Sequence, residues 1–440
     1  MSTHQSFRSE EAKKARFTVL GTALLMILMV VGLSACSADG QAIWNIVDYR
    51  VRKAFPPLLV PGSDDPAHRG SLTGTIRDEQ GKPVSDAVAL VATARGQSFD
   101  ARSDSQGRFH ITGIPPGRYV PVATAWQYEQ QTANPVRIRA GQPTTVDFRL
   151  AEAVPEPLTP LNLQLGPAQL ASSRFPQPSL ASRIPFTFTL DGATIDGGLI
   201  YLPADPPDGP LPTLAMIYPS EPINWDPASV ALTSAGYALL AVGPDKDRGL
   251  DIEAHVRDFR AALELWQAGQ LSPLGQPADD WILISGSFGS LILYRALRDI
   301  EPHQAPAAVI NIGGISDAFL GVQSLYSVNQ ELTIPPPYDL AVAAMGRTDR
   351  DPAFFLRLSP VHFANYLPPT LVIHTYNDEI IPFNQASAMD SALADAGIPH
   401  ELLLYEDTTH YLDARYPTES TYMVFDRVLE FVETTLEPAQ

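Results

Sequence analysis

With 440 residues the chain exceeds one ordinary domain, since domains hold about 100–200 residues. Lys and Arg total 30 against 49 Asp and Glu, and a formal net charge of −19 excludes a sequence-independent grip on nucleic-acid phosphates. A hydrophobic content of 45% is enough to fill real cores, and the single cysteine excludes an intramolecular disulfide and a cysteine-based zinc site.

Residues 1–35 have the pattern of a signal peptide. A basic N-terminus precedes the uncharged run 17–35, which ends Leu33-Ser34-Ala35-Cys36. This ending resembles the lipobox of bacterial lipoprotein signal peptides, in which the cysteine is acylated. The resemblance implies a protein held to the cell membrane by a lipid on Cys36, facing the extracellular or periplasmic side. The alternatives are an uncleaved run that spans the bilayer and an inert core cysteine.

Residues 36–69 are predicted to be a tether and linker. Ile43, Val47 and Val51 recur every four residues, which predicts a short helix. Such a helix lies either on the membrane surface or on its own protein. Pro56-Pro57 ends the segment in either case.

Residues 70–150 are predicted to form a β-sandwich. Short alternating apolar runs, such as Leu72 to Ile76, are separated by turns about every ten residues. Gly74-Thr75-Ile76, Asp104 with Gly107, and Pro116-Gly117 resemble motifs of the carboxypeptidase regulatory-like (transthyretin-like) domain. The resemblance implies a structural or sugar-surface-binding role rather than catalysis, and we expect the block to act as a spacer.

The remainder is predicted to be a linker followed by an α/β domain. Proline-rich residues 151–183 favour a semi-rigid linker or a strap on the next domain. Across 184–440, apolar strands alternate with amphipathic helices, which predicts a largely parallel sheet covered by helices. One helix is predicted after Asp251, because the following apolar residues share one face: Ile252, Val256, Phe259, Leu263 and Trp266.

A candidate nucleophile follows the strand predicted at 281–285. A serine on a sharp strand-to-helix turn needs small residues two positions before and two after it, and Ser285 and Gly289 meet this need around Ser287. The usual pattern is G-x-S-x-G, so Ser285 is a departure. A serine hydroxyl also needs an imidazole to take its proton and a carboxylate to orient that imidazole.

Candidates for these partners follow the next strands. Asp378 comes after the strand predicted at 370–374, and His410 comes after the strand at 401–405. This region resembles the α/β-hydrolase family, particularly its dienelactone-hydrolase-like, acetyl-esterase-like and prolyl-oligopeptidase-like members. The resemblance implies Ser287 as nucleophile, Asp378 as the orienting acid and His410 as the general base. Glu379 and Asp407 are rival acids.

An oxyanion hole requires two backbone donors. The resemblance implies one from the N–H of Phe288 and one from the loop after the strand at 213–218. Pro219 has no N–H, so we expect Ser220 or Glu221 to supply the second. The long excursion between Ile312 and Thr370 is either a cap over the site or an ordinary helical connection.

These patterns predict an α/β-hydrolase fold preceded by a small all-β sandwich. The expected function is a membrane-anchored extracytoplasmic serine hydrolase that cleaves carboxylic esters, free or polysaccharide-linked, through an acyl-enzyme. The alternatives are a prolyl-oligopeptidase-like peptidase and a non-catalytic surface-binding protein on an inactive hydrolase scaffold. The sequence holds no metal or nucleotide motif, so no cofactor is expected.

Overall fold

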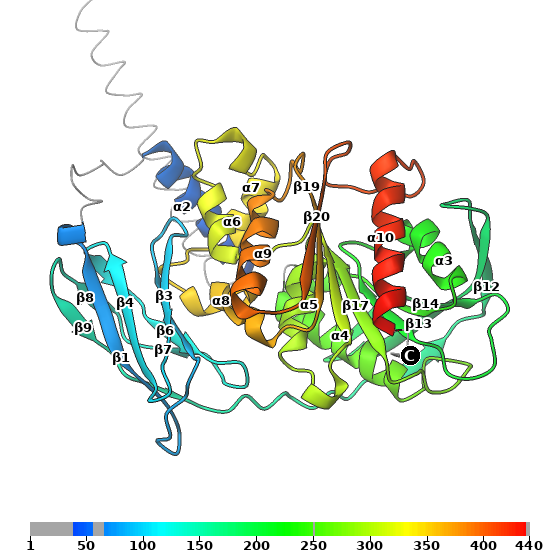
Figure 1. Cartoon of the computed structure of the whole chain (residues 1–440), viewed down its shortest axis with the longest axis horizontal. Coiled ribbons are helices and arrows are strands. Elements are labelled where there is room, and N and C mark those ends of the chain that lie inside the picture. Colours follow the sequence, from blue (N-terminus) through cyan, green and yellow to red (C-terminus); the bar gives the residue numbers. More distant parts are fainter. Residues whose placement is uncertain (1–37, 56–65, 250, 437–440) are drawn as a thin grey trace, which may run out of the picture.

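The computed structural model describes residues 38–55, 66–249 and 251–436 (Figure 1). The expected signal segment and Cys36 lie outside these residues. Within the described ranges, no helix is both long and apolar enough to cross a membrane.

A ten-stranded sheet forms the centre of the C-terminal part. Its strand order is β11-β13-β14-β16-β15-β17-β18-β19-β20, with β12 paired to β13. The hairpin β13–β14 is antiparallel, whereas the strands from β16 to β20 run parallel. The strands are β11 (Leu161–Leu165), β12 (Gln169–Ser173), β13 (Ser179–Leu190), β14 (Ala193–Pro203), β15 (Thr213–Ile217), β16 (Ala238–Val242), β17 (Trp281–Gly286), β18 (Ala308–Ile312), β19 (Thr370–Thr375) and β20 (His400–Tyr405).

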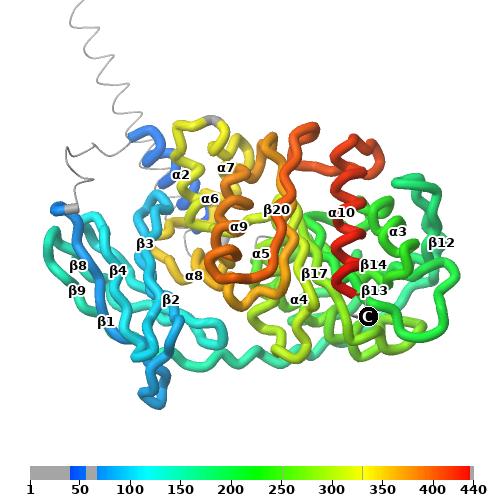
Figure 2. The backbone as a smooth tube through the Cα atoms, viewed as in Figure 1, coloured from blue at the N-terminus to red at the C-terminus, as the bar shows by residue number. Residues whose placement is uncertain are grey.

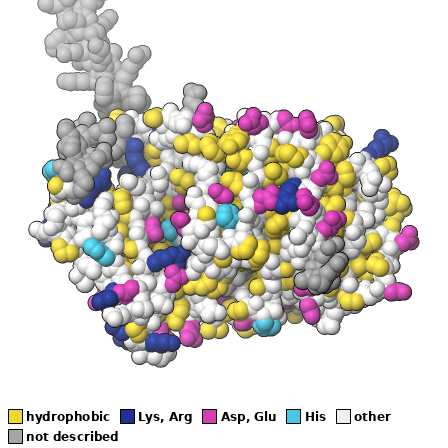
Figure 3. All heavy atoms as spheres, in the orientation of Figure 1, with side chains coloured by type: hydrophobic (Ala, Val, Ile, Leu, Met, Phe, Trp, Pro, Cys, Tyr) yellow, Lys and Arg dark blue, Asp and Glu magenta, His cyan; other side chains and the backbone are white. Residues whose placement is uncertain are grey.

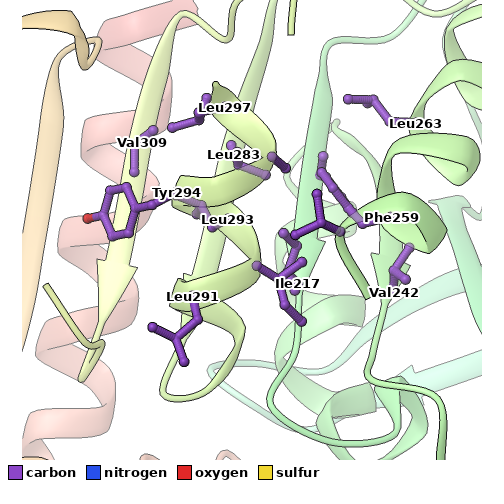
Figure 4. Close-up of a cluster of buried hydrophobic side chains, with 14 of the residues drawn as sticks. Ile217, Val242, Phe259, Leu263, Leu283, Leu291, Leu293, Tyr294, Leu297 and Val309 are labelled. Atoms are coloured by element: carbon purple, nitrogen blue, oxygen red, sulfur yellow. The ribbon is translucent and has the colours of Figure 1, made fainter. Parts of the chain in front are cut away.

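Helices cover both faces of this sheet (Figure 1). One face carries α4 (Ile252–Gln267), α5 (Gly289–Leu297) and α9 (Asn384–Ala396), and the other carries α3 (Asp226–Ser234) and α10 (Glu419–Leu436). Figure 4 shows Leu283 and Val309 of the sheet against apolar side chains of α4 and α5. The predicted helix after Asp251 is confirmed, and its N-cap carboxylate accepts from the N–H of Ala254. This layering confirms the predicted α/β-hydrolase-like fold.

The N-terminal block is a β-sandwich, as predicted. One sheet has the order β10-β1-β4 with β9 beside β1, the second has the order β3-β2-β6-β7, and β5 pairs with β8. Leu72 and Phe109 of the first sheet share a core with Ala89 and Val91 of the second. The strands are β1 (Gly70–Asp78), β2 (Val88–Ala92), β3 (Ser98–Arg102), β4 (Arg108–Ile114), β5 (Gly117–Tyr119), β6 (Val122–Thr124), β7 (Gln131–Thr132), β8 (Val136–Ile138), β9 (Pro143–Thr145) and β10 (Phe148–Leu150).

The sandwich packs directly on the α/β domain. Every residue of β2 is buried, because its alternate side chains face two different cores. Val88, Leu90 and Ala92 belong to the same apolar cluster as Phe319 and Phe355 of the α/β domain. The sandwich is therefore not the separate spacer expected from the sequence.

Residues 151–183, expected to be a semi-rigid linker or a strap on the next domain, contribute two strands to the sheet. The chain leaves β10, crosses the molecule and forms β11 and β12 beside β13 (Figure 2). Prolines flank these strands at the edge of the sheet, where a missing N–H is tolerated. The sheet therefore begins before residue 184.

The helix predicted within the tether packs on its own protein. α2 (Ala38–Ala54) lies against α7 (Tyr338–Ala344). The Tyr49 hydroxyl donates to Oδ2 of the buried Asp339 at 2.9 Å, and Asn45 donates to the Ala344 carbonyl at 2.9 Å. These bonds join the N-terminal helix to the excursion between β18 and β19.

That excursion holds three short helices between the sandwich and the central sheet (Figure 1). They are α6 (Ala318–Ser324), α7 and α8 (Pro352–Arg357), followed by the 3₁₀ turn η6 (Pro360–Tyr366).

The turn from β17 into α5 is packed tightly against its neighbours. Ser287 has a φ of +51°, and its N–H donates to the Ile312 carbonyl at 3.1 Å. A Cβ on Gly289 would overlap the carbonyl oxygen of Ile217. The sequence pattern of small residues around Ser287 therefore has a direct steric cause.

We expect Gly289→Ala to destabilise the protein by about 1–3 kcal/mol, the usual cost of forcing an extra methyl group into a packed site. Urea unfolding measures this change. Gly321→Ala in α6 is the matched control, because its Cβ would meet no atom closer than 3.9 Å. Equal stabilities of the two variants would contradict the proposed packing constraint.

Candidate active site

The structure brings Ser287, His410 and Asp378 together at the C-terminal edge of the sheet. His410 Nε2 lies 2.9 Å from Ser287 Oγ, and His410 Nδ1 lies 2.7 Å from Asp378 Oδ2. Ser287 starts the turn into α5, whereas Asp378 and His410 follow β19 and β20. Asp378 and His410 are buried, and Ser287 is partly exposed, so the base is oriented inside the protein and the hydroxyl faces a pocket.

Asp378 is held as a carboxylate by four hydrogen-bonding groups. Its Oδ1 accepts from the N–H groups of Ile380 and Ile381 at 2.9 and 2.7 Å. Its Oδ2 lies 3.2 Å from His374 Nε2, in addition to His410. Burial raises the pKa of Asp378, but the hydrogen bonds from His374 and His410 outweigh it and hold that pKa well below its usual range.

His374 is a site residue that the sequence patterns did not single out. It is buried at the end of β19, and its Nε2 also lies 2.9 Å from the Ile381 carbonyl oxygen. His374 therefore holds the loop that carries Asp378 against the end of β19. Its position at a strand end, four residues before Asp378, is the signal that would have pointed to it.

The two rival acids have other partners. Glu379 accepts from the backbone N–H of His410 at 3.0 Å, which fixes the loop that carries the imidazole. Asp407 accepts from the N–H of Ser420 at 3.0 Å, at the start of α10. Neither carboxylate is bonded to the His410 ring, so Asp378 is the acid that orients it.

The loop after β15 places Ser220, rather than Glu221, in the wall of a pocket that Ser287 also lines. Tyr218 uses its N–H in a bond to the Val242 carbonyl, and Pro219 has none. Ser220 lines the same pocket as Ser287 and Phe288, whereas Glu221 is exposed and lines a different hollow. The Phe288 N–H lies at the N-terminal end of α5, where the first amides have no partner from an earlier turn. Of the two expected second donors, only Ser220 lines the pocket that contains Ser287.

The Ser220 loop is held in place by an aromatic side chain. The Trp225 indole donates to Ser220 Oγ at 3.1 Å, and its ring stacks on Tyr218 with centroids 5.6 Å apart. A Cβ on Gly243 would overlap the Ser220 carbonyl oxygen, so the loop also lies flat against the neighbouring strand end.

Two apolar pockets meet at Ser287. The smaller, of about 130 Å³, lies towards α3 and α10 and is lined by side chains such as Met216, Leu232 and Phe425. The larger, of about 350 Å³, lies beneath the excursion between β18 and β19 and is lined by side chains such as Val342 and Phe355. The excursion therefore forms a wall of the site, as the cap interpretation expects.

The pocket walls carry no Asp, Glu, Lys or Arg among the described residues. The outer surface differs, because Figure 3 shows acidic side chains spread over the viewed face of the α/β domain. Among the same described ranges, no group of three or more His, Cys, Asp and Glu is placed to hold a metal ion.

Ser285, the departure from the usual turn sequence, is accommodated without displacing Ser287. It is buried at 3% exposure, and its hydroxyl has no hydrogen-bond partner within the described structure. The backbone of Ser287 still adopts the left-handed conformation that presents its side chain at the tip of the turn.

The solved structures that match parts of this chain include a sugar hydrolase, an esterase and a peptidase. A sugar hydrolase from Lactococcus lactis has 14% identity and a TM-score of 0.44, covering 57% of this chain and 98% of that chain. Carboxyl esterase 2 from Tuber melanosporum has 14% identity and a TM-score of 0.46, covering 62% and 86%. The acylaminoacyl peptidase of Pyrococcus horikoshii has 14% identity and a TM-score of 0.48, covering 83% and 64%.

Two segments of the chain match family models, and no curated protein matches it. Residues 71–151 match the carboxypeptidase regulatory-like domain, which is the β-sandwich. Residues 315–439 match the prolyl oligopeptidase family, and this segment includes Asp378 and His410. The fold and this match together support a serine hydrolase, with a carboxypeptidase regulatory-like domain at its N-terminal side.

Proposed function

We propose that the protein hydrolyses carboxylic esters that carry uncharged, apolar groups on both sides of the scissile bond. The observation that carries this proposal is the pair of apolar pockets that meet at Ser287. Burying an unpaired charge in such a pocket costs roughly several kcal/mol of free energy. A substrate with a free carboxylate or ammonium group is therefore disfavoured there.

The hydrogen-bonded set supplies each proton step of the reaction. His410 Nε2 takes the Ser287 proton as Oγ attacks the ester carbonyl, and the Asp378 carboxylate stabilises the imidazolium that forms. The N–H groups of Phe288 and Ser220 are the proposed donors to the oxyanion. The protonated His410 then donates to the leaving alkoxide, and water, activated by the same imidazole, releases the acid from the acyl-enzyme.

A peptidase is the second candidate, favoured by the match of residues 315–439 to the prolyl oligopeptidase family. The same triad cleaves either bond, so the distinction lies in binding and leaving-group chemistry. An ester and an amide with the same acyl group and the same substituent on the leaving alcohol or amine provide a matched pair. Amide hydrolysis with a kcat/KM comparable to that on the ester would assign the protein to the peptidases, because an amide is intrinsically far less reactive than the matched ester.

We expect a fluorophosphonate probe to label the purified protein and to lose all labelling in Ser287→Ala. Mass spectrometry of the labelled peptide gives the site. The neighbouring Ser285→Ala is the control, because its buried hydroxyl bonds to nothing in the described structure and its loss leaves labelling intact. An unlabelled wild-type protein, folded by circular dichroism, would favour the non-catalytic scaffold instead.

We expect Asp378→Asn to lower kcat by about 10⁴-fold, as loss of the orienting carboxylate does in other serine triads. The physical cause is an imidazole held in the wrong tautomer. Asp407→Asn is the matched control, since an amide oxygen still accepts from the N–H of Ser420. If the Asp407 variant loses more activity than the Asp378 variant, the acid has been misassigned.

We also propose that the protein is anchored to the membrane through a lipid on Cys36 and faces away from the cytoplasm. The support is the sequence Leu33-Ser34-Ala35-Cys36 after an apolar run. Two or more acyl chains give stable anchoring, since each buried CH₂ contributes about 0.8 kcal/mol.

We expect Cys36→Ser to abolish incorporation of an alkyne-labelled fatty acid and to leave the N-terminal segment uncleaved. In-gel detection of the alkyne and N-terminal sequencing measure the two effects. Unchanged fatty-acid incorporation in the variant would contradict the anchor. Cleavage at another site would point to an ordinary signal peptide.

A further inference from the structure

The wall of the larger pocket rests on the β-sandwich. Ala318 and Gly321 of α6 line this pocket, while Phe319 and Val322 of the same helix are buried in the cluster that contains Val88, Leu90 and Ala92 of β2. Phe355 of α8 belongs to both the lining and the cluster. The short helices α6 and α8 thus lie between the sandwich and the larger pocket.

These helices depend on their neighbours for position. α6 and α7 have 7 residues each and α8 has 6. Isolated helices shorter than about 12–15 residues are marginal in water, so tertiary contacts fix where such short helices lie. In the sandwich, α8 packs on β2 and β6, and α6 lies against the turn between β2 and β3.

The turn 93–97 between β2 and β3 contacts this wall directly. Gly96 has a φ of +86°, and a Cβ there would overlap the Phe319 carbonyl oxygen and lie 2.6 Å from the Gln323 nitrogen. Gln323 Nε2 donates to the Gly96 carbonyl at 3.2 Å. The buried Thr348, which follows α7, donates to the Thr93 carbonyl at 2.6 Å. The turn therefore contacts both α6 and the segment that follows α7.

A second set of contacts ties the sandwich to the helix that begins at the nucleophile. Arg298, at the C-terminal end of α5, donates to the carbonyls of Ala125 and Tyr128 at 3.2 and 3.4 Å. Trp126 stacks on Tyr366 of η6 with centroids 5.1 Å apart and planes 10° from parallel. The sandwich is thus attached to the α/β domain both at the turn 93–97 and at Arg298 and Trp126. Two separate attachments prevent it from rotating against α6.

From this geometry we infer that the β-sandwich sets the substrate selectivity of the enzyme, with Gly96 as the positioning residue. Through the turn 93–97, the sandwich determines how far α6 stands from the Ser287 pocket. It thereby limits the size of the apolar ester group that fits the larger pocket. This inference rests on the proposed ester hydrolysis at Ser287.

The test compares Gly96→Ala with Gly81→Ala in the full chain. Gly81 lies in a sandwich turn with a φ of +83°, but a Cβ there meets no atom within 4 Å, so the two variants carry similar backbone strain and only one clashes with α6. We measure kcat/KM on two ester series, one varying the acyl chain and one varying the alcohol. Active enzyme is counted by fluorophosphonate titration.

We expect Gly96→Ala to lower the ratio of kcat/KM for long over short members of one series by about tenfold, the discrimination that one methylene carries in an apolar pocket. Gly81→Ala retains the wild-type ratio. The rate of labelling by a small fluorophosphonate stays unchanged in both variants, because the triad is not moved. A wild-type ratio in both variants, or an equal change in both, would overturn the inference.

Gln323→Ala serves as the second variant if Gly96→Ala does not fold. It removes the bond to the Gly96 carbonyl without adding an atom, and we expect the ratio to rise because the wall is released. An unchanged ratio in this variant would overturn the inference as well. Absence of labelling in the wild type is a different result, since it defeats the proposed function and not the docking geometry.

Discussion

Close packing of the chain around Ser287 is the constraint on which the rest of the site depends. Its N–H is bonded to the end of β18, and Gly289 lies against the end of β15. Three adjacent parallel strands therefore meet at one turn, and their register decides where the hydroxyl points. The loops after β19 and β20 then reach the same edge, because parallel strands end together. This brings Asp378 and His410 to Ser287, and the contacts of His374 and Glu379 fix the two loops there.

The electrostatics of the site follow from this placement. A carboxylate at a buried sheet edge loses its hydration, and its charge is tolerated only where hydrogen bonds replace the lost water. The backbone N–H groups of Ile380 and Ile381 and the rings of His374 and His410 supply them. The low pKa of Asp378 keeps it ionised, so the carboxylate orients His410 without taking a proton from it.

Features that depend on residues close together in the sequence were predictable from it, whereas features that depend on tertiary packing were not. The small residues around Ser287, the strand before Asp378 and the chain order of the triad are local patterns that reveal the fold and the candidate site. The apolar run 88–92 predicts a buried strand, but its composition does not say that two different domains cover it. Likewise, only the three-dimensional arrangement shows that Ser220 rather than Glu221 lines the Ser287 pocket and that His374 contacts Asp378.

The shared apolar cluster also decides whether the wall of the larger pocket behaves as a lid. Undocking the sandwich would expose Val88, Leu90 and Val122, and each fully buried side chain of this kind contributes about 1.5–3 kcal/mol. The contacts of Arg298 and Trp126 would be lost in the same step. Separating the sandwich from the α/β domain therefore costs roughly several kcal/mol of free energy. The sandwich contributes no residue to the described lining of the pocket, but it thus supports α6 and α8 permanently, and these helices form a fixed wall rather than a lid.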